Sequence, residues 1–83
     1  MIRDELWSVS INRIRAFFDT QPDIIPTDTG YQYSTCHITL TEMPPKDAVR
    51  FQIPRTQVVF DGLDADVSDI YHRFMIQFLT TGG

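Results

Sequence analysis

The sequence predicts one small α+β domain spanning residues 1–83, with elements in the order α-β-β-β-α. Apolar residues recur at helical spacing near both ends of the chain, whereas the period changes to two in the middle. Hydrophobic residues make up 42% of the chain, which is ordinary for a globular protein. We therefore expect an antiparallel three-stranded meander with both helices packed on its apolar face.

The first helix is expected over residues 4–19. Its apolar residues follow the four-three-four spacing of one helical face, at Trp7, Ile11, Ile14 and Phe18. Trp7 is therefore expected to be buried against the last helix or the sheet. Pro22 and Pro26 prevent continuation of the helix, so residues 21–30 are expected to form a loop.

Residues 31–43 alternate with a period of two and predict the first strand. One face would contribute to the core, with Cys36, Ile38 and Leu40. The opposite face would carry Tyr33, Thr35, His37, Thr39 and Thr41. The sequence Pro-Pro-Lys-Asp at 44–47 predicts a turn after this strand.

Residues 48–60 allow two interpretations. One bent strand, paired across the 44–47 turn, would place Leu40 opposite Phe51 but would move Val58 to the other face beyond Pro54. A second turn at Pro54-Arg55 would instead place Phe51 opposite Val58, with all apolar residues on one face. The second interpretation is preferred, so Phe51 is expected to be a core residue.

The last helix is expected over residues 65–79, with Asp64 or Asp66 as its cap and Gly82 as its terminator. Its apolar stripe contains Val67, Ile70, Tyr71, Phe74, Phe78 and Leu79.

The net charge is −4, and the seven basic residues are scattered, so nucleic acid is an unfavourable partner. Four aspartates form the one clear charge cluster: Asp61, Asp64, Asp66 and Asp69. At the start of a helix they would cap it and offset its dipole. They could also dock on a basic partner protein, and the sequence leaves both roles open.

The sequence predicts no catalytic residue, metal site or cofactor. Cys36 and His37 are neighbours on a strand, so their side chains point to opposite faces. No spacing of Cys and His residues suits zinc. The single cysteine, Cys36, and the lack of an apolar run of about 18 residues or a signal peptide point to the cytoplasm and away from a membrane.

These features favour a non-enzymatic protein-interaction module, acting as an adaptor, inhibitor or regulator. Besides the aspartates, its expected partner-binding residues are Tyr33, His37, Thr39 and Arg50, on the sheet face away from the helices. One alternative is a small nuclease-like toxin or RNA-processing factor that uses His37 or His72 with Arg50. Another is an obligate homodimer, joined through the outer sheet face or an edge strand.

Overall fold

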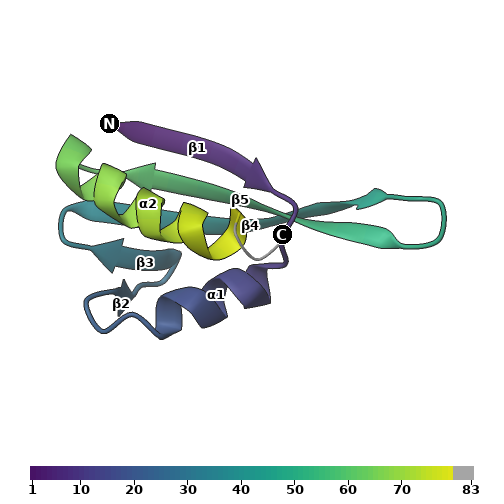
Figure 1. Ribbon diagram of the computed structural model, residues 1–83, viewed down its shortest axis with the longest axis horizontal. Coiled ribbons are helices and arrows are strands. Elements are labelled where there is room, and N and C mark those ends of the chain that lie inside the picture. Colours follow the sequence, from purple (N-terminus) through teal and green to yellow (C-terminus); the bar gives the residue numbers. More distant parts are fainter. Residues whose placement is uncertain (80–83) are drawn as a thin grey trace.

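The computed structural model of the chain describes residues 1–79. It contains two helices and one five-stranded antiparallel sheet with strand order β1-β5-β4-β3-β2 (Figure 1). The elements are β1 (Ile2–Trp7), α1 (Ile11–Asp19), β2 (Ile25–Pro26), β3 (Gly30–Tyr33), β4 (Cys36–Asp47), β5 (Gln52–Asp61) and α2 (Asp64–Leu79). The α+β class and the last helix are confirmed, whereas the three-stranded meander is wrong in its number of strands. The expected helix terminator, Gly82, lies outside the described residues.

The predicted first helix is correct only in its second half. Residues 2–7 form strand β1, and α1 begins at Ile11 because Ser10 caps it, accepting a hydrogen bond from the backbone N–H of Arg13 at 3.3 Å. Trp7 reaches the core from the end of this strand. Its ring packs edge-on against Phe74 with centroids 4.9 Å apart, and it is partly buried.

The predicted strand over residues 31–43 is divided into two. A tight turn at Ser34 and Thr35 separates β3 from β4, and Ser34 adopts a left-handed backbone with φ of 52°. Tyr33 pairs with Cys36 across this turn. Paired residues share a face, so Tyr33 lies on the core side, and its expected place beside His37 is wrong. The predicted loop over 21–30 contains the short strand β2.

Strands β4 and β5 form one long hairpin. Residues 44–47 belong to β4, the turn lies at residues 48–51, and β5 runs without a break through Pro54 and Arg55. The preferred turn at Pro54-Arg55 is therefore wrong, and residues 52–61 are one strand. Leu40 pairs with Val58, which keeps the apolar residues of both strands on the core face. The register shifts between Met43 and Lys46, where two prolines interrupt the ladder.

Both helices cover the same face of the sheet, and the core lies between them (Figure 1). Phe74 of α2 is at its centre, with its ring against those of Phe18 in α1 and Phe60 in β5. Cys36 is fully buried, as expected. Neither helix within residues 1–79 is long and apolar enough to cross a bilayer.

Candidate functional site

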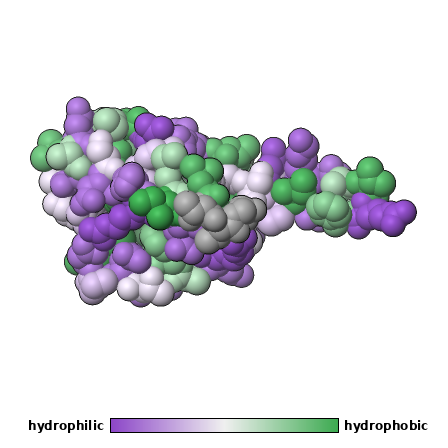
Figure 2. Space-filling view, viewed as in Figure 1, coloured by the Kyte–Doolittle hydropathy of each residue, from purple (hydrophilic) through white to green (hydrophobic). Residues whose placement is uncertain are grey.

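The distal part of the β4–β5 hairpin projects from the rest of the molecule. Strand β3 pairs with β4 only as far as Thr39, and β1 pairs with β5 only from Thr56 onward. Residues 43–55, which we call the arm, therefore form a two-stranded ribbon with no third strand. Figure 2 shows the arm standing clear of the rounded body, with hydrophobic residues along it.

The tip of the arm exposes large apolar side chains. Val49 is 99% exposed and Phe51 is 66% exposed, so the expected burial of Phe51 is wrong. The cause is the position of the turn, which places both residues in the loop rather than in a strand over the core. Arg50 lies between them at the tip, and not on the sheet face where it was expected.

Hydrogen bonds and prolines stiffen the arm. The Arg55 Nε donates to the backbone oxygen of Pro44 at 3.0 Å, and the Gln52 amide donates to Asp47 Oδ1 at 3.1 Å. The tip is closed by the Ala48 N–H, which donates to the Phe51 oxygen at 2.8 Å. The arm is thus a defined structural element and not an unstructured loop.

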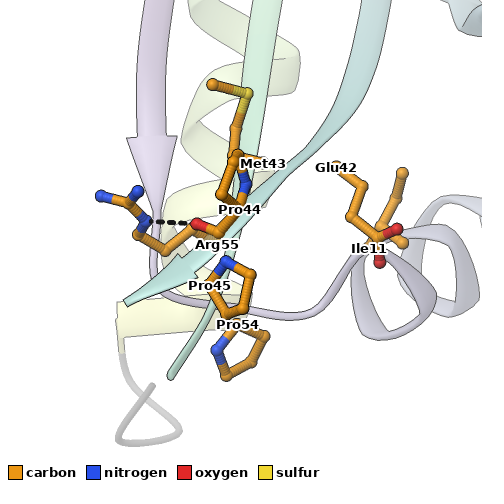
Figure 3. A pocket seen from close by; sticks show the side chains of 7 residues that line it. All are labelled: Ile11, Glu42, Met43, Pro44, Pro45, Pro54 and Arg55. Atoms are coloured by element: carbon orange, nitrogen blue, oxygen red, sulfur yellow. Dashed lines mark hydrogen bonds between the residues drawn. The ribbon is translucent and has the colours of Figure 1, made fainter. Parts of the chain in front are cut away.

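A hollow of about 450 Å³ lies at the root of the arm (Figure 3). Three prolines and Met43 supply much of its apolar lining, and Ile11 reaches it from the start of α1. The lining residues are Ile11, Glu42, Met43, Pro44, Pro45, Pro54 and Arg55. Its two charged groups are one carboxylate and the Arg55 guanidinium, which already donates to Pro44. The lining of the hollow is thus mostly apolar.

The sheet face away from the helices holds two of the four residues expected there. His37 pairs with Asp61, and Thr39 pairs with Val59, all on this open face. Tyr33 is on the opposite face, under α2, and Arg50 is on the arm. The structure therefore divides the expected set between three places.

The four aspartates are mostly engaged within the chain. Asp66 accepts hydrogen bonds from the Thr35 hydroxyl and backbone N–H, which hold the pKa of this carboxyl below its usual range. Asp64 lies 3.3 Å from the N-terminal amine of Met1. Asp69 accepts a hydrogen bond from the Tyr33 hydroxyl, which raises the pKa of that tyrosine. Asp64 and Asp66 lie in the first turn of α2, where they also offset the helix dipole.

A bidentate ion pair fastens the second half of α2 to the loop before β2. The Arg73 guanidinium donates to both carboxylate oxygens of Asp23, at 3.0 and 2.9 Å, and lowers the pKa of that carboxyl. The same guanidinium lies over the Tyr33 ring, 5.0 Å from its centroid. Sequence analysis missed this contact, because the partners are 50 residues apart and no local pattern links them.

The residues considered for catalysis are not brought together. His37 is on the open sheet face, His72 is on α2, and Arg50 is at the arm tip. Within residues 1–79, no three His, Cys, Asp or Glu side chains are grouped so that they could hold a metal ion. No family model, curated protein or solved structure matches this chain, so its function has to be inferred from the arm and the sheet themselves.

Proposed function

We propose that this protein is a non-enzymatic interaction module, an adaptor, inhibitor or regulator that docks on another protein through its arm. The observation that carries the proposal is the exposure of Val49 and Phe51 at the tip of a projecting two-stranded ribbon. Apolar side chains gathered on a projection are typical of protein-binding surfaces.

The energetics favour a partner that covers the tip. Full burial of a phenylalanine side chain stabilises a complex by about 1.5–3 kcal/mol. A two-stranded ribbon is marginally stable in water when it stands alone, so contact with a partner would also stabilise the arm. Three prolines protect the arm against strand addition, because they lack backbone N–H groups: Pro44, Pro45 and Pro54. Recognition would therefore depend on side chains.

The arm also defines the chemistry of its partner. Lys46 and Arg50 lie near Val49 and Phe51 in the sequence of the tip, which is thus both apolar and basic. Ten of the eleven acidic residues lie outside residues 43–55, whereas three of the seven basic residues lie within residues 43–55. The complementary surface is an apolar pocket with an acidic rim.

The cluster of four aspartates is the weaker candidate for docking on a basic partner, because Asp64, Asp66 and Asp69 already have partners in the chain.

We include a cytoplasmic location in the proposal. The thiol of Cys36 is free and buried, as suits a reducing compartment.

A matched pair of substitutions tests the proposal. Phe51 and Leu63 are almost equally exposed, at 66% and 65%, but only Phe51 lies on the arm. Tagged wild-type protein, Phe51→Ser and Leu63→Ser would be used to capture partners from the native host, with quantification by mass spectrometry. We expect a partner that Leu63→Ser retains and Phe51→Ser loses, with unchanged melting temperatures. Equal capture of the same partners by both variants would contradict the proposal.

A further inference from the structure

Strand β1 leaves one edge of the sheet open. It is the outermost strand, and within residues 1–79 no strand pairs with its outer side (Figure 1). Met1 and Gly62 exchange two backbone hydrogen bonds, at 2.8 and 3.1 Å. Successive residues of an antiparallel strand direct their N–H and C=O groups to alternate sides. Ile2, Asp4 and Leu6 therefore direct theirs outward.

The other edges of the sheet are less able to accept a strand. β2 at the opposite edge has only two residues, and one of them is Pro26. The free edges of the arm are interrupted by its three prolines. β1 has six residues and no proline, so it offers the longest uninterrupted row of free backbone groups.

We propose that a second copy of this chain pairs its own β1 antiparallel with this edge, so that the two sheets become continuous about a two-fold axis. In an antiparallel pair, directly opposed residues share a face. The two-fold axis keeps each residue on the same face in both copies, so even-numbered residues must oppose even-numbered residues and odd-numbered must oppose odd-numbered. The pairing is therefore centred on a residue, which opposes its own copy. Centring on Asp4 pairs Ile2 with Leu6 of the second copy and Arg3 with Glu5 of the second copy.

Charge selects this register over its neighbours. Centring on Arg3 opposes two arginines, and centring on Glu5 opposes two glutamates, in each case at non-hydrogen-bonded positions where side chains are closest. Centring on Asp4 opposes two aspartates at a hydrogen-bonded position, where the Cα atoms are about 5.5 Å apart. That pair lies on the open face, in contact with water.

The backbone favours the same register. Only with the pairing centred on Asp4 do Ile2, Asp4 and Leu6, whose polar groups point outward, all form hydrogen-bonded pairs within β1, whereas centring on Arg3 or Glu5 leaves one of the three without a partner in the strand. Arg3 and Glu5 then meet their counterparts at the closer positions, on the side of α2. In each copy they already lie 3.2 Å apart, with Arg3 over the Tyr71 ring at 3.8 Å. Both charged groups are thus held where the two β1 strands would meet, a line that we call the seam.

Apolar burial adds to the pairing. Ile2 is 68% exposed and Leu6 is 53% exposed, and both lie on the open face of the sheet. Two copies would bring both residues from each chain together across the seam. This removes apolar surface that a single copy leaves in water.

Reversing the charge at position 3 or position 5 tests the register. Arg3→Glu makes positions 3 and 5 both acidic, and Glu5→Lys makes them both basic. In a dimer of either variant, the two pairs between position 3 of one copy and position 5 of the other are repulsive; in a mixed dimer, both of these pairs are attractive. We expect the wild type to be dimeric by analytical ultracentrifugation and each variant to be monomeric. An equimolar mixture should recover a dimer, identified as a heterodimer by native mass spectrometry. A wild type that stays monomeric at its highest soluble concentration would overturn the proposal, as would folded variants whose mixture shows no heterodimer.

Glu5 also accepts hydrogen bonds from Tyr71 and Trp7, so a change at this position disturbs contacts beneath α2. A third variant leaves these side chains untouched. Asp4→Asn removes the one repulsive seam pair and should lower the dimer Kd about two- to fivefold. An unchanged or raised Kd would contradict the register. The dimer does not involve the arm, so Phe51→Ser should leave it intact, and the two proposals can fail separately.

Discussion

The carboxylate of Asp66 accepts two hydrogen bonds from Thr35, one from the backbone N–H at 3.1 Å and one from the hydroxyl at 2.6 Å. The same hydroxyl accepts a hydrogen bond from the N–H of Leu63 at 3.1 Å. The β3–β4 turn, the residue before α2 and the first turn of α2 are thus joined at one point. These donors favour the ionised carboxyl, with the hydroxyl as the largest contribution, and hold the pKa of Asp66 below 3.8.

This contact predicts acid sensitivity. The folded pKa of Asp66 is lowered, so its contribution to stability is present above the unfolded value near 3.8 and is lost as the pH falls through the folded value. Asp66→Ala should lower the thermal midpoint at pH 7 and weaken its decline between pH 5 and pH 2, measured by circular dichroism. Asp28→Ala, on an exposed loop, is the control. An acid decline as steep as that of the wild type would contradict the assignment.

The environment of the Tyr31 hydroxyl predicts that the protein loses stability at alkaline pH. Its hydroxyl donates to Asp19 at 2.8 Å, and burial, followed by this carboxylate, raises its pKa to about 12. The stability that it contributes is complete below the unfolded pKa of 10 and is lost as the pH rises toward 12. Titration of tyrosinate absorbance should show Tyr31→Phe losing the step near pH 12. If that step instead disappeared in Tyr33→Phe, the assignment would be wrong.

Phe74 and Phe51 should differ sharply in their effect on stability. Phe74 is fully buried among aromatic rings, whereas Phe51 is mostly exposed on the arm. Phe74→Ala should cost about 3–5 kcal/mol in the free energy of unfolding. Phe51→Ala should change it by less than about 0.5 kcal/mol, as expected for a surface position. Urea denaturation compares the two directly, and similar losses for both would mean that the arm tip is packed against the body.

Gly30 should not tolerate a side chain. A Cβ at this position would lie 2.0 Å from the backbone oxygen of Ile38, on the neighbouring strand β4. Gly30→Ala should therefore force β3 away from β4 and cost about 2–3 kcal/mol. Hydrogen exchange of the β3 amides should accelerate in this variant and not in Thr29→Ala. Unchanged protection in Gly30→Ala would show that the two strands are less close than described.

Local patterns predicted best where one period describes one element. The last helix was expected over residues 65–79 and runs from Asp64 to Leu79, because its apolar stripe faces a single surface, the sheet. The core face of Cys36, Ile38 and Leu40 was also correct, since these residues lie within one strand and alternate with exposed or half-buried ones.

The first helix shows how a period can mislead. Trp7 continues the stripe of Ile11, Ile14 and Phe18 by spacing, and all four pack in or against the core. Trp7 does so from a strand, however, because Ser10 caps a helix that begins only at the next residue. The capping serine was the local signal that could have corrected the boundary. The strand before it depends on pairing with β5, whose paired residues are 49 to 59 positions away.

The sequence by itself determined the α+β class, the last helix and the face of β4 that enters the core, because these depend on hydrophobic periodicity along short segments. Only the tertiary structure decided where the hairpins turn. A turn displaced by a few residues moves every later side chain relative to the core. This is why Tyr33 lies under α2 and why Arg50 and Phe51 are at the tip of the arm. The open edge at β1 likewise depends on pairing with β5, a strand that is distant in the sequence.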